Sequence, residues 1–273
     1  PENTHVIPIP NNFRGKYRGS GSAKKYLNEV ETCIKNIHSK KRGLGGFIIE
    51  PILSCGGQDG LPGGFLEDAY NLVRKNGGIC ISDEVQVGCG RIGKSFWGFE
   101  IHNVIPDIIP IGKPLGNGHP IGAVVCTKDI AESFANGMEF FNTFGGNPVS
   151  CSIGTEVLRF IKKEKLQENS RIIGDYFKGE LIKLSKHYNI IGDVRGKGLF
   201  LGIEFVDRNM NPLMEETVYI VNRLKKYGIL SSVDGPDNNV IKIKPPLVFS
   251  KEDANFLIEV LTSVLGEDWM KIG

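Results

Sequence analysis

The chain has 273 residues, which is enough to bury a sizeable core. Its 33 lysine and arginine residues nearly balance 31 aspartate and glutamate residues, so no basic surplus favours nucleic-acid binding. Hydrophobic residues make up 40% and charged residues 23%, an ordinary globular composition that excludes a disordered chain.

The first half of the chain has the pattern of alternating helices and short buried strands. After a loop at 1–22, apolar spacing predicts two helices, at 23–41 and 65–76, separated in part by a glycine-rich loop at 54–64. Short apolar runs of the kind found in parallel sheets predict strands at 47–51, 79–83, 107–111 and 122–126. Strand, helix and strand at this spacing indicate a parallel α/β sheet with right-handed crossovers.

The second half has a different texture, typical of a smaller α+β domain. A long helical region at 149–186 is expected to break near 168–170. The remaining elements are expected as extended runs at 198–205 and 240–243 and helices at 215–227 and 251–265. We place the domain boundary at residue 166, which gives domains at 1–166 and 167–273.

Six cysteines are spread through the chain without a C-x-x-C pair, so the sequence predicts no zinc or other metal site. A disulfide framework is not expected at this density, and a reducing, cytosolic compartment is favoured, with a mitochondrial location left open. No apolar stretch approaches the roughly 18 residues of a membrane span, so no membrane partner is expected.

Residues 88–95 (G-C-G-R-I-G-K-S) match two phosphate-binding patterns, G-x-x-x-x-G-K-[ST] and G-x-G-x-x-G. Both patterns need an α-helix directly afterwards, so that the phosphate meets a helix N-terminus. The residues that follow, F-W-G-F-E and then Pro106, are poor helix formers. We therefore favour a glycine-rich turn here and keep a P-loop nucleotide-binding module as an alternative from another class of function.

An acid and a lysine follow two of the predicted strands. Asp83 closes the strand at 79–83, and Lys113 lies between glycine and proline after the strand at 107–111. Ligands of open α/β sheets bind beyond the carboxyl ends of the strands. A lysine and an acid at that edge suit pyridoxal phosphate chemistry, in which the lysine amine joins the cofactor and the acid pairs with the protonated pyridine nitrogen. A plain ion pair between the two residues is the simpler alternative.

Five ordered segments resemble the class-III aminotransferases, which are fold-type I pyridoxal-phosphate enzymes. The segments are I-I-E-P at 48–51, D-E-V-Q-V-G-C-G-R at 83–91, P-D-I at 106–108, G-K-P-L-G-N-G at 112–118 and F-G-G-N-P at 144–148. R-G-K-G-L at 195–199, followed by G-I-E at 202–204, resembles the small domain of the family. The resemblance covers essentially the whole chain. It implies an α/β fold: an incomplete large domain with a mainly parallel sheet, followed by an α+β C-terminal small domain.

The resemblance assigns roles to four residues by position. Lys113 would be the Schiff-base lysine and proton shuttle, Asp83 would hold the pyridine nitrogen, and Gln86 would lie near the ring hydroxyl. Thr143 would bind the cofactor phosphate of the partner subunit, which implies a homodimer with shared active sites. The substrate would be a small-molecule amine.

Two positions depart from the common family pattern. Cys55 stands where many members carry a glutamate after the Glu-Pro motif, and Lys242 stands where many carry an arginine before a Pro-Pro pair. Lysine lacks the fork with which arginine grips a carboxylate, but it binds phosphate as a compact charge. With the S-C-G-G-Q, G-N-G-H-P and K-P-P segments, these changes resemble the phospho-lyase branch. Its members release phosphate, ammonia and an aldehyde from ethanolamine phosphate or 5-phosphohydroxylysine.

We therefore expect phospho-lyase chemistry, with Lys242 and Cys55 as candidate substrate residues and Lys244 as a second cation. Period-2 alternation also fits two lysines that simply face solvent. A true transaminase, of the ω-amino acid, 4-aminobutyrate or alanine–glyoxylate type, is the alternative within the family, and a non-catalytic fragment is a further one. The family's N-terminal phosphate loop has no counterpart before Pro1, so the chain resembles the C-terminal portion of a longer enzyme.

Overall fold

The computed structural model describes residues 3–270, and the chain divides into two compact units. The first unit comprises residues 1–51, 61–89 and 96–165. The second comprises residues 52–60, 90–95 and 166–273, so two short segments from the first half of the sequence belong to it. The division into two functional domains at residue 166 stays a prediction.

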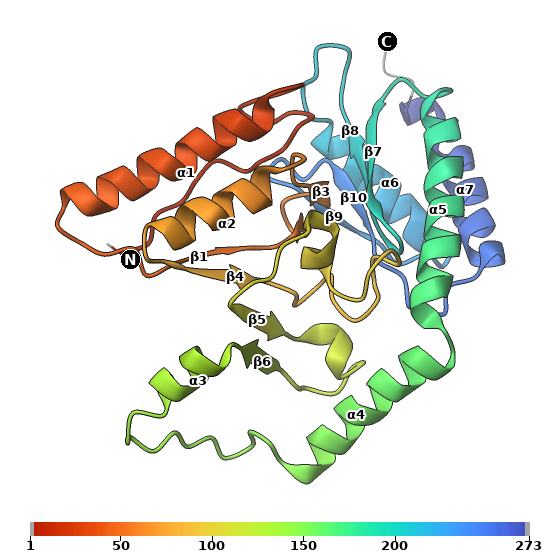
Figure 1. Cartoon of the computed structure of the whole chain (residues 1–273). Coiled ribbons are helices and arrows are strands. Elements are labelled where there is room, and N and C mark those ends of the chain that lie inside the picture. Colours follow the sequence, from red (N-terminus) through yellow and green to blue (C-terminus); the bar gives the residue numbers. More distant parts are fainter. Residues whose placement is uncertain (1–2, 271–273) are drawn as a thin grey trace. The chain divides into compact units, whose positions relative to one another are not determined.

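The first unit is built on a four-stranded sheet with the order β1-β4-β5-β6 (Figure 1). β1 (Gly46–Ile49), β4 (Ile79–Ser82) and β5 (Ile108–Ile111) run parallel, and β6 (Ala123–Cys126) is antiparallel to β5. The expected α/β class and the parallel direction of the first three strands are confirmed. Because parallel strands end at the same edge of a sheet, the residues that follow β4 and β5 share one edge.

Helices α1 (Ser22–Ser39) and α2 (Phe65–Lys75) pack against each other, and α2 also packs on β1 and β4. The rings of Tyr26 in α1 and Phe65 in α2 meet edge to face with centroids 6.4 Å apart, and both are fully buried. Two further helices of this unit, α3 (Lys128–Phe134) and α4 (Pro148–Lys163), follow β6 and are largely exposed.

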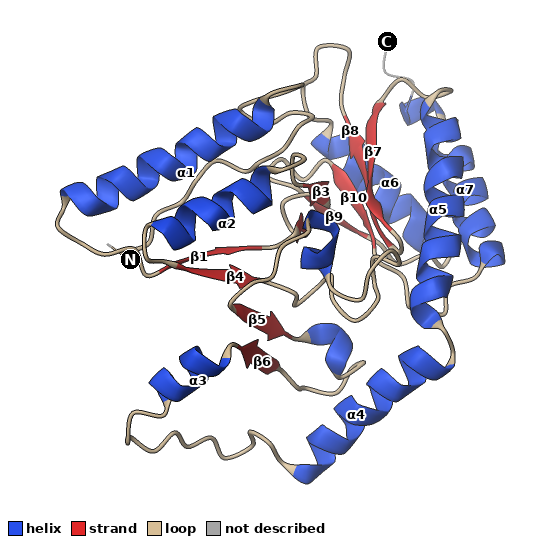
Figure 2. Cartoon of the chain, in the orientation of Figure 1, coloured by secondary structure: helices blue, strands red, loops and turns tan. Residues whose placement is uncertain are grey.

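The second unit is built on a four-stranded antiparallel sheet with the order β7-β8-β10-β9 (Figure 2). Its strands are β7 (Ile191–Lys197), β8 (Phe200–Phe205), β9 (Ser232–Asp234) and β10 (Val240–Ile243). Its helices are α5 (Leu166–Ser185), α6 (Met214–Lys226) and α7 (Lys251–Leu265), and a 3-10 turn η3 (Asp268–Met270) follows. The core of the unit joins these helices to one face of the sheet, which presents Leu201, Ile203, Phe205, Ile241 and Ile243.

The opposite face of this sheet is polar. Strand alternation and register place Arg195, Glu204, Asp234 and Lys242 together on it. A short antiparallel pair, β2 (Ile52–Leu53) and β3 (Asp59–Gly60), contributes the turn that contacts this face. The sequence predicted only a loop over 54–64, because two-residue strands carry no periodic signal.

The expected break in the helical region is present, but it lies at 164–165, a few residues before the predicted 168–170. α4 ends at Lys163 and α5 begins at Leu166, with Lys165 between them in the left-handed region at a φ of 52°. Ser170, at the predicted position of the break, is fully buried inside α5. Its hydroxyl donates to the carbonyl of Arg91 and accepts from the N–H of Leu199, so its polar group is satisfied within the helix.

The glycine-rich segment at 88–95 is followed by a 3-10 turn, η1 (Gly98–His102), and not by an α-helix. Gly93 has a φ of 72°, and a Cβ atom there would lie 2.5 Å from the Cα of Arg171 in α5. Glycine at this point therefore lets residues 90–95 pack on α5. The nucleotide-binding alternative lacks the helix N-terminus that it requires.

Candidate functional site

The carboxyl edge of the first sheet carries Asp83 and Lys113 on adjacent strand ends. Asp83 follows β4 directly, and Lys113 begins a 3-10 turn, η2 (Lys113–Leu115), two residues after the end of β5. The N–H of Asp83 donates to the carbonyl of Ile49 at 3.0 Å, and the N–H of Glu84 donates to the carbonyl of Pro110 at 3.1 Å. The backbone at 83–84 is therefore held by the strands on both sides.

Glu84 is fully buried beside Asp83 and anchors the segment from below. Its Oε2 accepts from the N–H of Gly98 at 2.7 Å, and its Oε1 accepts from the N–H of Phe99 at 2.8 Å and the hydroxyl of Ser82 at 3.2 Å. Burial raises the pKa of Glu84, and the two backbone hydrogen bonds act in the opposite direction. Glu84 had no predicted role, although a second acid directly after an apolar strand is visible in the sequence.

The side chain of Lys113 is exposed and forms no hydrogen bond or ion pair with any other residue among 3–270. The residue before it packs on the Asp83 segment: a Cβ atom on Gly112 would lie 3.1 Å from Cγ1 of Val85. Leu115, at the other end of the turn, is buried. The turn that carries the lysine is therefore fixed at both ends, while the amine itself remains free to react.

The carboxylate of Asp83 is half-buried and oriented by its own chain. Its Oδ1 accepts from the N–H of Val85 at 3.0 Å, two residues further on. Within the described chain, its Oδ2 has no hydrogen-bond donor. Gln86, half-buried, follows in the same turn. An oriented carboxylate with one open oxygen is the acceptor that a protonated ring nitrogen requires.

Thr143 lies in the exposed loop between α3 and α4. Oδ1 of Asn142 accepts from the N–H of Gly145 at 2.8 Å, and Asn147 caps α4 by accepting from the N–H of Ser150 at 2.9 Å. The hydroxyl of Ser150 also lies 2.7 Å from Nε2 of His119, which follows the Lys113 turn. This contact links the end of the Thr143 loop to the Lys113 turn within the first unit.

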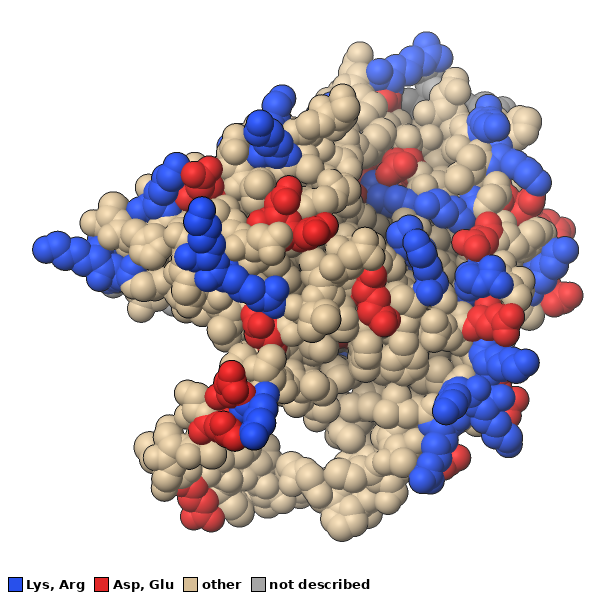
Figure 3. Space-filling model, viewed as in Figure 1, with Lys and Arg blue, Asp and Glu red and all other residues tan. Residues whose placement is uncertain are grey.

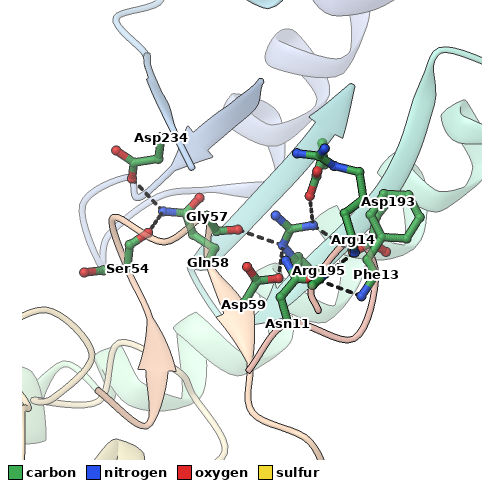
Figure 4. Close-up of polar contacts among 12 residues, drawn as sticks. Asn11, Phe13, Arg14, Ser54, Gly57, Gln58, Asp59, Asp193, Arg195 and Asp234 are labelled. Carbon is green, nitrogen blue, oxygen red and sulfur yellow. Dashed lines mark hydrogen bonds and ion pairs between the residues drawn. The ribbon is translucent and has the colours of Figure 1, made fainter. Parts of the chain in front are cut away.

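The two candidate substrate residues belong to the second unit, where one short stretch of chain connects their surroundings. Nζ of Lys242 lies 3.0 Å from Oδ1 of Asp234. Oδ2 of Asp234 accepts from Nε2 of Gln58 at 2.7 Å (Figure 4). The carbonyl of Cys55 accepts from the N–H of Gly235 at 3.0 Å. Positions 55 and 242, far apart in sequence, thus meet around Asp234 and its neighbour.

Arg195 holds the same segment at a second point. Its Nε donates to the carbonyl of Gly57 at 2.7 Å and lies 2.8 Å from Oδ1 of Asp59. Its Nη1 lies 3.0 Å from Oδ2 of Asp193 and also donates to Glu204 (Figure 4). The guanidinium is nine-tenths buried, and its planar fork matches several acceptors at once. Sequence reasoning used Arg195 only as a family marker, and its partners could not be inferred from local pattern.

A metal cluster and a membrane-spanning helix each require particular features of the described residues. Over residues 3–270, no group of three or more His, Cys, Asp or Glu side chains could hold a metal ion, and no helix is long and apolar enough to cross a membrane. Basic and acidic side chains are interspersed on the face drawn in Figure 3. A cavity of about 320 Å³ in the second unit is lined by His187, Asn189 and Arg208, among others, and by none of the predicted site residues.

Residues 1–265 match the family model described as aminotransferase class-III. The chain belongs to the class-III aminotransferase family. This match confirms the resemblance inferred from the ordered segments. The members of the family are enzymes that depend on pyridoxal phosphate. Asp83 and Lys113 therefore occur in a member of a family that uses this cofactor.

The relatives of the chain include both transaminases and phospho-lyases by name. It is 45% identical over 280 residues to alanine–glyoxylate aminotransferase 2-like of Drosophila melanogaster, covering 98% of this chain and 57% of that protein. It is 38% identical to ethanolamine-phosphate phospho-lyase homolog 1 of Caenorhabditis elegans, covering 97% and 59%. A solved phospholyase from Arthrobacter in complex with phosphoethanolamine has a TM-score of 0.88 at 39% identity, covering 90% of this chain and 59% of that one. The chain thus spans little more than half the length of these relatives.

Proposed function

We propose that this protein is a pyridoxal-phosphate enzyme that acts on a phosphorylated primary amine. The observation that carries the proposal is the presence of Asp83 and Lys113 at the ends of the adjacent parallel strands β4 and β5. The two residues do not form the plain ion pair that was the simpler alternative, because the Lys113 side chain has no acidic partner among residues 3–270.

The residues at this edge suit the cofactor. Asp83 presents a carboxylate with one oxygen fixed by Val85 and the other open, and Lys113 presents an exposed amine. Glycine at position 112 lets the backbone before Lys113 approach Val85 closely, so the backbone that carries Lys113 is packed against the backbone that carries Asp83. Gln86 would lie near the ring hydroxyl and Thr143 near the phosphate of a cofactor bound by the partner subunit.

Each of these residues has a defined task in the proposed chemistry. Bound pyridoxal phosphate supplies an electron sink for the carbon that bears the substrate nitrogen. Lys113 would hold the cofactor covalently at rest and, once displaced by the substrate amine, would remove a proton from that carbon. Asp83 would keep the pyridine nitrogen protonated by pairing with it. The buried Glu84 would keep the Asp83 backbone in place through its bonds to Gly98 and Phe99.

The phospho-lyase outcome needs a leaving group on the neighbouring carbon. As the proton leaves, the C–O bond to phosphate would break, and water would then release ammonia and an aldehyde. No oxo acid takes part, which agrees with the loss of the usual glutamate at Cys55 and of the usual arginine at Lys242. Lys242 would supply positive charge to the phosphate, sharing its ammonium between this group and Asp234, since an ammonium has three donors.

A true transaminase is the second candidate, and the 45% identity to the Drosophila alanine–glyoxylate aminotransferase 2-like protein favours it. The deciding measurement is phosphate release from ethanolamine phosphate and 5-phosphohydroxylysine by the natural protein, with and without an added oxo acid. Stoichiometric phosphate release without any oxo acid supports the phospho-lyase. Amino transfer to glyoxylate or pyruvate without phosphate release supports the transaminase. A protein that forms no covalent bond between Lys113 and pyridoxal phosphate would contradict both and leave the non-catalytic reading.

We further propose that the protein works as a homodimer, in the cytosol or in mitochondria. Support for the dimer comes from a run of exposed apolar side chains around Thr143 in the first unit: Phe134, Met138, Phe140, Phe141, Phe144 and Val149. The Arabidopsis thaliana and Homo sapiens relatives are mitochondrial by name, which favours that location. A dimeric mass in light scattering is expected, and a monomer that still binds the cofactor would contradict the shared-site arrangement.

A further inference from the structure

The segment between β2 and β3 carries Cys55 and is joined to Lys242 by a single carboxylate. Oδ1 of Asp234 accepts from Nζ of Lys242 at 3.0 Å, and Oδ2 accepts from Nε2 of Gln58 at 2.7 Å. The same Gln58 nitrogen donates to the carbonyl of Ser54 at 2.8 Å, next to Cys55. Each oxygen of Asp234 thus serves a different part of the chain.

The burial of these groups keeps water from replacing the contacts of the bridge. Asp234 is 9% exposed and Gln58 is fully buried, so neither side chain can replace its partner with bulk water. Lys242 is the most exposed member, with about a quarter of its side chain accessible. A change at the accessible lysine therefore reaches the buried glutamine through Asp234.

We propose that Asp234 is a positioning residue that makes Lys242 and the Cys55 segment move together as one substrate-facing group. The substrate-facing role rests on the proposed function, whereas the mechanical coupling does not. The backbone bond from the N–H of Gly235 to the carbonyl of Cys55, at 3.0 Å, adds a second link beside the side-chain bridge. If Lys242 moved toward a bound phosphate, Asp234 would move with it, and the segment at 54–58 would shift through its contact with Gln58.

The thiol of Cys55 provides a readout that needs neither cofactor nor substrate. Cys55 and Cys151 are both exposed, and they lie in different units, so the rate of iodoacetamide alkylation at Cys55 can be expressed relative to Cys151 by peptide mass spectrometry. We expect Asp234→Asn to raise the relative rate about five-fold, because an amide offers only one acceptor oxygen to two donors. Glu259→Gln, which removes an exposed carboxylate from the same unit, should leave the rate unchanged. Asp234→Glu, which restores the carboxylate, should return the rate toward the parent value.

A second pair of variants tests the path if Asp234→Asn does not fold. Lys242→Met should raise the relative rate at Cys55 about two-fold in the parent protein and have no effect in a Gln58→Leu background, where the bridge is already cut. Equal effects of Lys242→Met in both backgrounds would overturn the proposal, as would an unchanged Cys55 rate in folded Asp234→Asn. Failure of phosphate release would remove the proposed function and leave this coupling intact, so the two ideas fail separately.

In an active preparation, Asp234→Asn should raise the KM for the phosphorylated amine several-fold while kcat changes less. A structural role without positioning would instead lower the amount of folded enzyme and leave KM unchanged.

Discussion

The N–H of Gly98 donates to Oε2 of Glu84 at 2.7 Å, and the next N–H, of Phe99, donates to Oε1 at 2.8 Å. One buried carboxylate thus satisfies the first two donors of η1 and fixes the chain immediately after Asp83. The pKa of Glu84 is raised by burial above its ordinary value of 4.5. The folded state therefore holds the Glu84 proton more tightly than the unfolded state.

This arrangement predicts a pH-dependent cost for Glu84→Gln. The amide offers one acceptor to two buried N–H groups, so we expect a loss of about 1–3 kcal/mol. A raised pKa contributes stability that is complete below 4.5 and is lost as the pH rises through the folded-state value. The cost of the substitution should therefore be larger in mildly acidic than in neutral buffer. Urea unfolding of both proteins across this range measures it, and a cost independent of pH would contradict the protonation argument.

Lys113→Ala should abolish covalent cofactor binding without unfolding the protein. The side chain is exposed and has no partner among residues 3–270, so its loss removes no buried contact. We expect the absorbance band of lysine-bound pyridoxal phosphate to vanish and the thermal midpoint of the apoprotein to stay the same. Lys162→Ala, an exposed lysine in α4, is the matched control and should keep the band.

Lys242→Ala should weaken binding of a phosphorylated amine more than it slows turnover. Loss of a charge-assisted contact costs about 1.5–3 kcal/mol, which corresponds to a KM raised about ten-fold or more. Cofactor absorbance should remain, because Lys242 and Lys113 belong to different units. Unchanged kinetics would support the reading in which Lys242 only pairs with Asp234. Lys226→Ala in α6 serves as the control for charge.

Two glycines of α5 should respond in opposite directions to alanine. A Cβ atom on Gly174 would lie 2.3 Å from the carbonyl carbon of Gly198, so Gly174→Ala should cost about 1–3 kcal/mol or more by overpacking. No heavy atom lies within 4 Å of the Cβ position of Gly179, so Gly179→Ala should stabilise the helix by about 0.5–1 kcal/mol. Chemical denaturation of the two variants tests the packing of α5 on the β7–β8 turn.

Arg195→Met should strongly destabilise the second unit. It removes the Arg195 guanidinium from Asp59 and Glu204, both nearly inaccessible, and removal of one partner from a buried ion pair costs about 3–5 kcal/mol. Arg195→Lys should recover only part of the loss, since a single ammonium cannot match the fork of contacts to Gly57 and Asp193. Equal stability of the two variants would mean that geometry does not matter here.

The first sheet could be predicted well from the sequence because its strands are short, continuous apolar runs that end at Asp83 or just before Lys113. Buried parallel strands leave that signature whatever surrounds them. The positions of Asp83 and Lys113 on one edge followed from it. Their roles, and those of Gln86 and Thr143, stay predictions, because they came from the family resemblance and depend on a cofactor.

Only the side of Lys242 on the polar face of the second sheet could be predicted, from the alternation of its strand; the partners on that face could not. β7 mixes glycine with charged residues, and its Arg195 is buried through partners far away in the chain, so no local period indicates a strand. The helix break was misplaced for a related reason: the helix continues through Ser170, whose hydroxyl is satisfied by Arg91 and Leu199 from elsewhere in the chain. In both places, tertiary partners overrode the local pattern.

The bond from Arg195 to Gly57 closes a separation of 138 residues, and that from Gln58 to Asp234 closes one of 176. Loop closure over such distances must precede the contacts that favour it, which makes them late steps in folding. On the ribosome, residues 52–60 emerge long before β7 to β10 are synthesised. Until then, the carboxylate of Asp59 and the amide of Gln58 are solvated by water. Residues 166–273 alone therefore cannot complete the second unit. A fragment that begins at residue 166 would lack the segment that covers its polar face.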